Sequence, residues 1–310
     1  MSLWRRHPGI AYGAVLLGVG GHASSEFVSV LTGIAGPELS VWRFLLGGLG
    51  LVLLALCFPE SRNLAAPLRA HPLRLVLLSL VGVSGAYLAF HWALDFATVP
   101  QVATVVTTIP IFVAIINLRI NGQPVSRGKV ISGVAAVAGV AILITDGYLG
   151  QLAGTGRNLI GILLAMTCAA LGAGYAVLVR PVIVEWGALR VTAVTMMLGG
   201  VGLWLVVAVF WGLPVNPATL FERAAGQWSA LLVLALFNTT ITQFLWFGGL
   251  AAVPDLTRGS YLFFLKPVIA ATLAVGFLAQ ALSLAEVLAI GVICAAVAVE
   301  AGRDLVGRRP

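Results

Sequence analysis

Long apolar runs alternate with short polar segments along the whole chain. Each run has about 20 residues, the length that an α-helix needs to cross the hydrocarbon core of a bilayer. We therefore predict an all-α integral membrane protein with ten transmembrane helices. The predicted spans are residues 9–31, 38–58, 72–94, 98–118, 127–146, 158–180, 188–212, 228–252, 256–278 and 284–302.

The second half of the chain repeats the first. Alignment of the two halves places Pro110 over Pro267, at a separation of 157 residues that also relates the polar turns that follow. An internal repeat of apolar spans is typical of transporters built from two related halves. We therefore divide the chain into residues 1–147 and 148–310, with five spans each. Because five is an odd number, the second half is expected to enter the membrane inverted relative to the first.

Composition agrees with a membrane protein that is surrounded by lipid. Of the 310 residues, 60% are hydrophobic and 9% are charged, whereas soluble proteins carry about 25% charged residues. The net charge of +7 is spread singly over the connections, which argues against a nucleic-acid partner. Cys57, Cys168 and Cys294 all lie within spans and lack the spacing of metal ligands, so we expect no metal site and no disulfide framework.

The basic residues predict an orientation. With the N-terminus in the cytoplasm, fourteen of the 18 Lys and Arg residues fall on the inner side, and the outer connections hold only Arg157 and Arg223. The positive-inside rule therefore predicts that both termini are cytoplasmic. Arg5 and Arg6 before an apolar stretch also fit a signal peptide, but the first span is needed to complete two halves of five. Glu300 and Asp304, at the last inner boundary, are expected to be solvated.

Both halves carry the same succession of structural motifs. Residues 94–144 contain a short turn between helices, a proline within a helix, a polar turn and a closing helix with glycine, and residues 249–300 repeat that order. Arg43, in the segment PELSVWRF, lies near the start of the second span. In these features nearly the whole chain resembles the EamA family of the drug/metabolite transporter superfamily.

This resemblance implies a fold of two inverted five-helix repeats, without a cofactor. It also implies export of amino acids or related small metabolites from the bacterial cytoplasm, across the inner membrane, by alternating access. Many EamA repeats carry glutamate in the polar turn, where this chain has Gln123 and Gln280. The turn at 121–123 is similar to that of the family's aromatic amino acid exporters. We expect a monomer or a homodimer.

Polar residues inside a bilayer are costly, so those at mid-span are candidates for function. In the third span, Ser84, Tyr87 and His91 share one helical face, and their counterparts in the eighth include Gln243. A central cavity for a small zwitterion with an apolar side chain is one interpretation, and hydrogen bonding between helices is the other. The candidate substrate-binding residues are His22, Glu26, Ser84, Tyr87, His91, Tyr175, Asn238, Gln243, Trp246, Tyr261, Phe264 and Lys266.

Three further residues carry a mechanical or electrostatic argument. A proline within a helix removes an amide hydrogen and crowds the preceding turn, so Pro110 and Pro267 are candidate hinges, with a static kink as the alternative. Lys266 is the lysine at mid-membrane, and it either receives a substrate carboxylate or pairs with an acid such as Glu26. Tyr261 lies on a different helical face from Lys266.

Other functions are less well supported. The segment 82–85 resembles the nucleophile motif of rhomboid proteases, but Ser84 and His91 are about 10 Å apart along one helix, too far for a nucleophile–base pair. We find no metal cluster and no phosphate loop, so we expect no enzyme. A channel would need a filter-like repeat or a ring of like charges. An exporter of drugs or organic cations, or an importer of the same superfamily, stays open.

Overall fold

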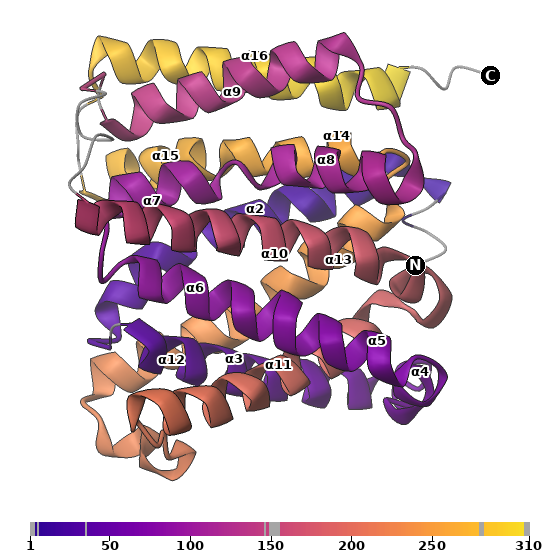
Figure 1. The fold of residues 1–310 in the computed structure, drawn as a ribbon, viewed down its shortest axis with the longest axis vertical. Coiled ribbons are helices and arrows are strands. Elements are labelled where there is room, and N and C mark those ends of the chain that lie inside the picture. The colour runs from indigo at the N-terminus through magenta and orange to yellow at the C-terminus, as the bar shows by residue number, and fades with distance from the viewer. Residues whose placement is uncertain are drawn as a thin grey trace.

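The computed structural model describes residues 4, 6–34, 36–145, 147–148, 156–278 and 282–306. Within them every regular element is helical, and the helices run alongside one another as a bundle (Figure 1). Eight helical segments of this part of the chain are long and apolar enough to cross a membrane. Two further segments, at 256–278 and 284–306, correspond to the ninth and tenth predicted spans. The predicted all-α membrane fold is confirmed.

The bounds of the helices follow the prediction closely, and several spans consist of more than one helix. They are α2 (Pro8–Leu31), α3 (Gly36–Cys57), α4 (Ala65–Ala70), α5 (Pro72–Leu77), η1 (Leu78–Gly85), α6 (Ala86–Ala93), α7 (Val99–Val106), α8 (Ile109–Asn121), α9 (Arg127–Thr145), α10 (Gly156–Trp186), α11 (Ala188–Trp211), η3 (Pro217–Glu222), α12 (Ala225–Ala235), η4 (Leu236–Ile241), α13 (Thr242–Ala252), α14 (Leu256–Ser260), η5 (Tyr261–Leu265), α15 (Lys266–Leu278) and α16 (Leu284–Val306).

The sixth span is longer than predicted. We expected it to end at residue 180, before a proline, but α10 continues through Pro181 to Trp186. A proline within a helix removes one hydrogen bond. The buried side chains of Val182 and Ile183 in the following turn favour continuation of the helix.

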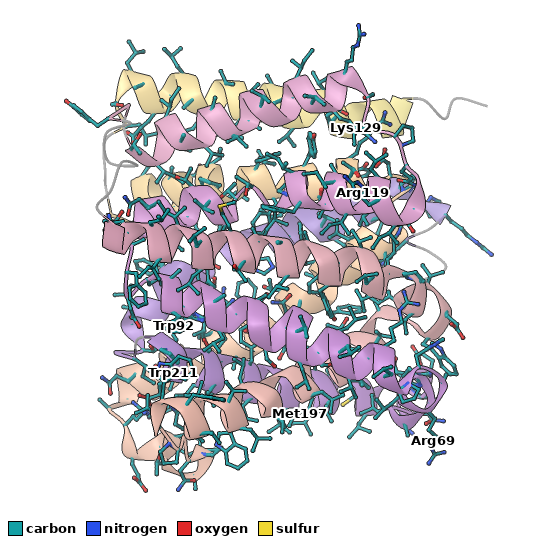
Figure 2. The ribbon with its side chains drawn as sticks, viewed as in Figure 1. Arg69, Trp92, Arg119, Lys129, Met197 and Trp211 are labelled. Carbon is teal, nitrogen blue, oxygen red and sulfur yellow. The ribbon has the colours of Figure 1, made fainter. Side chains whose placement is uncertain are left out.

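The bundle has two chemically different ends. Arg69, Arg119 and Lys129 lie at one end, which we call the basic end, whereas Trp92 and Trp211 lie towards the opposite end (Figure 2). The start of α2 and the end of α16 are both at the basic end (Figure 1). The rings of Trp92 and Trp211 meet edge to face, with their centroids 5.1 Å apart, as suits aromatic residues near a membrane interface.

Equivalent helices of the two halves begin in the same way. The hydroxyl of Ser126 accepts a hydrogen bond from the Lys129 amide at the start of α9, over 3.3 Å. The hydroxyl of Ser283 accepts one from the Glu286 amide at the start of α16, over 3.1 Å. Ser126 and Ser283 are 157 residues apart, so the sequence alignment also aligns the helix starts.

Glycine lets α3 and α11 cross closely at the centre of the bundle. The segments Gly-Gly-Leu-Gly in α3 and Gly-Gly-Val-Gly in α11 face each other across the two halves. A β-carbon on Gly48 would lie 2.8 Å from the Met197 Cα, and one on Gly200 would lie 2.6 Å from the Phe44 carbonyl oxygen. Small residues permit this approach of backbones in a bilayer, where packing drives helix association.

The fourth and ninth spans are interrupted at the same place. The fourth span breaks at 107–108 between α7 and α8, and the ninth changes to the 3-10 helix η5 between α14 and α15. Pro110 and Pro267 are each the second residue of the helix that follows. The expectation that they lie within continuous helices was therefore wrong. A proline in the first turn costs no hydrogen bond, because the amide there has no partner in its own helix.

The third and eighth spans each contain a π-helical turn, η1 and η4, at equivalent places. In η1 the Ser84 hydroxyl donates to the Ser79 carbonyl, and in η4 the Thr240 hydroxyl donates to the Ala235 carbonyl. In both cases the acceptor is five residues earlier, where the widened turn makes it accessible. Such π-turns within α-helices are often found at functional sites.

Candidate functional site

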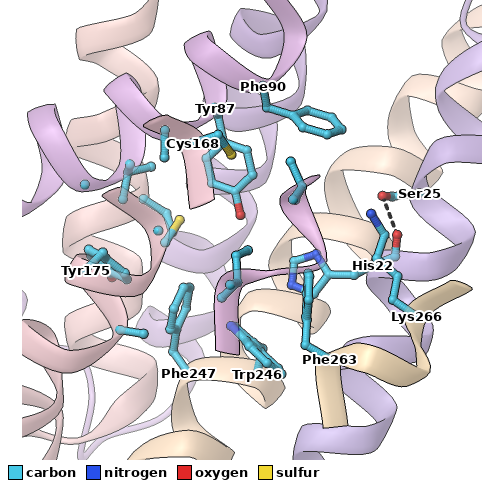
Figure 3. Close-up of a pocket in the computed structure, with 18 of the residues that line it drawn as sticks. His22, Ser25, Tyr87, Phe90, Cys168, Tyr175, Trp246, Phe247, Phe263 and Lys266 are labelled. Atoms are coloured by element: carbon cyan, nitrogen blue, oxygen red, sulfur yellow. Dashed lines mark hydrogen bonds between the residues drawn. The ribbon is translucent and has the colours of Figure 1, made fainter. Parts of the chain in front are cut away.

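A cavity of about 80 Å³ lies at the centre of the bundle, beside the interrupted spans (Figure 3). Residues of both halves form its wall. They are His22, Ser25, Arg43, Gly82, Val83, Ala86, Tyr87, Phe90, Val106, Ile109, Cys168, Gly172, Tyr175, Ala176, Met196, Trp246, Phe247, Phe263 and Lys266.

Two positive charges, those of Arg43 and Lys266, face this cavity, and both side chains are buried. The Arg43 Nε donates to the Thr239 hydroxyl over 3.1 Å. Its guanidinium carbon lies 6.0 Å from the centroid of the Tyr87 ring. The Lys266 Nζ lies 5.9 Å from the centroids of two aromatic rings. The described residues of the wall include no carboxylate.

Aromatic rings form a large part of the remaining wall. The rings of Trp246 and Phe263 are 5.2 Å apart, and the Tyr175 ring meets the Phe247 ring edge to face at 4.7 Å. The Tyr175 hydroxyl lies 2.6 Å from the Thr195 hydroxyl, so its polar end is occupied by α11. The wall thus offers flat apolar surfaces between two cations.

His22 adds a polar group to the wall. Its ring meets the rings of Trp246 and Phe263 edge to face, at 5.9 and 5.7 Å. Its Nε2 is buried and has no hydrogen-bond partner among the described residues. The neighbouring Ser25 hydroxyl donates to the His22 carbonyl over 2.8 Å (Figure 3). The imidazole is therefore held by aromatic contacts, with a nitrogen left for a ligand.

The interruptions of the fourth and ninth spans both border the cavity. Val106 and Ile109 flank the break between α7 and α8, and both line the cavity. Their counterparts 157 residues later, Phe263 and Lys266, line it too. In membrane transporters, substrate sites are commonly formed at interrupted helices, near the interface of the two repeats.

The structure brings five of the twelve predicted binding residues together in the cavity wall: His22, Tyr87, Tyr175, Trp246 and Lys266. The side chain of Glu26 lies outside the described residues. The other six are outside the cavity wall, and a role for them in binding stays a prediction. They are Ser84, His91, Asn238, Gln243, Tyr261 and Phe264.

The residues outside the wall mainly connect helices. The Gln243 amide donates to the hydroxyl of its repeat counterpart Tyr87 over 2.6 Å, and so positions a cavity residue. The Asn238 amide donates to the Gly21 carbonyl over 2.8 Å and thereby joins η4 to α2. The Ser84 hydroxyl donates to the Gly199 carbonyl of α11 over 2.7 Å.

Tyr261 and Phe264 lie together on the side of η5 away from the cavity. Their ring centroids are 5.4 Å apart, and the Tyr261 hydroxyl donates to the Lys129 carbonyl over 2.5 Å. Lys266 and Phe263 occupy the cavity side. The helical positions of Tyr261 and Lys266 in the sequence already indicated different faces, and the structure places them so.

Sequence reasoning missed several residues of the wall, most importantly Arg43 and Phe90. The sequence identifies Arg43 as a motif residue and does not indicate that it belongs to the site. Phe90 is the counterpart of Trp246 under the same repeat alignment that pairs Tyr87 with Gln243. The repeat alignment could have identified Phe90, because a binding residue predicted in one half, such as Trp246, predicts its counterpart in the other half.

Ion pairs hold the helices together at the basic end. The Lys129 Nζ is 2.5 Å from the Asp255 Oδ2, and the Arg258 Nε is 3.5 Å from the Glu300 Oε2. The Ser132 hydroxyl donates to Glu300 over 3.2 Å. Glu300 is fully buried, so the expectation of a solvated side chain was wrong. Because α16 packs against α9, the Glu300 carboxylate faces Arg258 and Ser132. The side chain of Asp304 lies outside the described residues.

A second pocket, of about 430 Å³, lies at the opposite end, and we call it the vestibule. Its wall includes Arg43 and Phe90, which also line the central cavity. Ser29, His91 and Asp95 are the other polar residues of its wall. The central cavity therefore shares two wall residues with a larger pocket at the opposite end.

Comparisons with known proteins are consistent with this architecture. A family model described as the EamA-like transporter family matches residues 9–145 and 159–300. A solved crystal structure of a protein has a TM-score of 0.77 and 19% sequence identity, and covers 96% of this chain and 99% of that chain. At that identity the likeness concerns the fold alone. No curated protein matches the chain.

The two matched stretches together cover most of the chain, and each lies in one of its halves. They confirm the family resemblance and the prediction that the chain is a transporter of small molecules and not an enzyme. The predicted boundary between residues 147 and 148 lies between them and stays a prediction. With two EamA domains in a multi-pass membrane fold, the chain belongs to the EamA-like transporter family.

Proposed function

We propose that this protein is a secondary transporter that exports amino acids with apolar or aromatic side chains, or related small carboxylates. The observation that carries the proposal is the central cavity, in which two buried cations stand among aromatic walls. A carboxylate group would be attracted to Arg43 and Lys266, and an apolar side chain would pack against rings such as those of Trp246 and Phe263.

The charge of the wall favours carboxylates over organic cations. In a medium of low dielectric constant, opposite charges attract strongly and like charges repel strongly. An organic cation would be attracted to aromatic faces, but Arg43 already lies over Tyr87 and Lys266 over Phe90 and Phe263. Exporters of drugs and organic cations are therefore the less favoured alternative within the family.

Transport would proceed by alternating access. The cavity of about 80 Å³ is smaller than pockets that hold drug-sized ligands, which are about 300–1,000 Å³. Cargo entry therefore requires the wall to move. The interruptions beside Pro110 and Pro267 are suitable hinges, because a break in a helix absorbs changes of backbone angle without the loss of many hydrogen bonds.

The direction of transport rests on the basic residues. We place the basic end in the cytoplasm, by the positive-inside rule. As the family resemblance implies, we place the protein in the inner membrane of a bacterial cell. In that orientation the vestibule is on the outer side. Both termini would be cytoplasmic, and the functional unit would be a monomer or a homodimer.

Counterflow in proteoliposomes tests this proposal. Vesicles are loaded with one amino acid of a panel of aromatic and aliphatic members, and uptake of the same labelled compound is measured; empty liposomes and one organic cation serve as controls. Accelerated uptake for apolar members of the panel is expected. Acceleration by the cation alone would contradict the proposal, and so would silence for the whole panel with correctly reconstituted protein.

A further inference from the structure

The central cavity and the vestibule are neighbouring spaces with two wall residues in common, Arg43 and Phe90. Phe90 belongs to α6 and is partly buried. Its ring lies at the rim of the cavity in Figure 3, above Lys266 and beside Tyr87. The Phe90 ring therefore borders both pockets.

Lys266 connects Phe90 to the other half of the protein. The Lys266 Nζ lies 5.9 Å from the centroid of the Phe90 ring and 5.9 Å from the centroid of the Phe263 ring. Phe90 belongs to the first half and Phe263 to the second. An ammonium group is attracted to the face of an aromatic ring, so Lys266 draws the Phe90 ring towards the cavity.

The wall beside Phe90 is held more firmly than the ring itself. The neighbouring His91 Nδ1 lies 2.5 Å from the Ser40 hydroxyl and 3.0 Å from the Tyr87 carbonyl oxygen. The Phe90 ring has no polar atom and contacts His91 edge to face, at 5.0 Å between centroids. Rotation of Phe90 therefore breaks no hydrogen bond, whereas movement of His91 breaks two contacts.

We propose that the vestibule is a second binding pocket on the transport path, and that Phe90 is the gate between it and the central cavity. The ligand of both pockets is the amino acid of the proposed function, on which this inference rests, and its ammonium group would face Asp95 in the vestibule. A carboxylate in the cavity attracts Lys266 and weakens its hold on the Phe90 ring. Arg43 lines both pockets, so it faces the carboxylate before and after the ring swings aside.

The repeat supplies a counterpart to this gate. Trp246 occupies the position of Phe90 in the second half. It is only 4% exposed and packs against His22 and Phe263. In an inverted repeat, equivalent residues face opposite sides of the membrane. Phe90 thus borders the vestibule, whereas its counterpart Trp246 is packed into the wall of the central cavity.

A native thiol gives a direct test of the gate. Cys168 lines the central cavity, and Cys57 and Cys294 are exposed. Replacement of Cys57 and Cys294 by alanine leaves Cys168 as the reporter. The protein is placed in lipid nanodiscs and treated with a small neutral thiosulfonate, and the rate of modification is followed by intact-mass spectrometry.

Phe90→Ala is expected to raise the rate at Cys168 about tenfold, because the aromatic obstruction and its contact with Lys266 are both removed. Lys266→Met is expected to raise it as well. The loss of a nearby positive charge by itself disfavours the thiolate and slows the reaction, so an increase reports access. Phe210→Ala is the matched control, because Phe210 is an exposed aromatic residue of α11, and it is expected to leave the rate unchanged.

Phe90→Leu and Phe90→Trp extend the test if the alanine variant does not fold. Leucine is expected to raise the rate and tryptophan to lower it. Equal rates for the parent protein and the folded Phe90 variants would overturn the gate. Since the reaction needs no cargo, that result would leave the proposed function standing, whereas silence in counterflow would overturn the function and leave the thiol result unaffected.

Discussion

The two halves of this protein build the same scaffold and carry different charges on it. Both halves interrupt the same span beside the cavity and cap the following helix with an aligned serine. The two cavity cations, in contrast, have uncharged counterparts: Arg43 aligns with Thr195 of α11, and Lys266 aligns with Ile109 of α8. The features that recur in both halves therefore belong to the fold, whereas the two cations of the cavity each occur in one half.

A pair of hydrogen bonds illustrates the conserved scaffold. The Ser84 hydroxyl donates to the Gly199 carbonyl over 2.7 Å, and its counterpart Thr240 donates to the Gly47 carbonyl over 2.9 Å. Each bond joins a π-helical turn of one half to the glycine segment of the other half. The two halves are thus linked by reciprocal contacts.

The glycine crossing is expected to show the largest effect, in both halves alike. In Gly200→Leu the new side chain would meet the Phe44 carbonyl oxygen, and in Gly48→Leu it would meet the Met197 backbone. Backbone cannot yield as a side chain does, so we expect each variant to be destabilised by about 3 kcal/mol or more. The yield of monodisperse protein in size-exclusion chromatography measures this.

Gly291→Leu in α16 is the control for the crossing, because a β-carbon there would meet nothing within 4 Å. Its yield should equal that of the unchanged protein. Normal yields for both Gly48→Leu and Gly200→Leu would show that α3 and α11 do not approach as described.

Lys266→Met should strongly reduce transport and leave the fold intact. Methionine keeps the length of the side chain and removes the charge that faces the cavity. The loss of a charged contact of about 2 kcal/mol corresponds to a decrease of about 30-fold in counterflow. Ile115→Met, at an exposed position of α8, is the control and should change counterflow less than about twofold. Equal effects of the two substitutions would show that the charge of Lys266 does not contribute to the binding site.

The prolines should have an intermediate and paired effect. In Pro110→Ala or Pro267→Ala the residue regains an amide hydrogen, which favours a continuous helix across the break. We expect the maximal exchange rate to fall about three- to tenfold, while half-saturation stays within about twofold. Concentration series of counterflow separate these two quantities. Normal turnover in both variants would show that Pro110 and Pro267 contribute to packing and are not hinges.

The reciprocal hydrogen bonds should show the smallest effect on transport. Ser84→Ala and Thr240→Val each remove one hydroxyl that connects the halves, with an expected loss of about 1 kcal/mol of stability. Thermal unfolding in detergent should shift by a similar few degrees in both, and counterflow should stay within about twofold. A Ser84→Ala variant that folds normally and does not transport would instead assign Ser84 to substrate binding.

Sequence patterns were sufficient for the fold, because each span must satisfy its own backbone and bury an apolar surface in lipid. The site was harder to predict. Helical spacing groups Ser84, Tyr87 and His91 on one face, but it does not say which of them a neighbouring helix covers. The Ser84 hydroxyl reaches α11 and His91 lies beside Ser40, while Tyr87 lines the cavity.

Arg43 shows the opposite limit. Its position near the start of α3 does not indicate that it lines the cavity. The Arg43 side chain is long, so its guanidinium group lies far from its Cα and reaches deeper into the bundle. Only the packing of η4 against α3 brings it to Thr239 and to the cavity wall. Long polar side chains in a bilayer are therefore located by their contacts and not by their position along a span.

Counterflow of an apolar amino acid and of its decarboxylated amine, for example phenylalanine and phenethylamine, tests most directly whether the two cations of the cavity select the cargo. The two solutes share the aromatic group and differ in the carboxylate that Arg43 and Lys266 would attract. We predict that the acid exchanges at least about tenfold faster than the amine, the equivalent of one lost charge contact. Equal or faster exchange of the amine would contradict the assignment of the cavity to carboxylates.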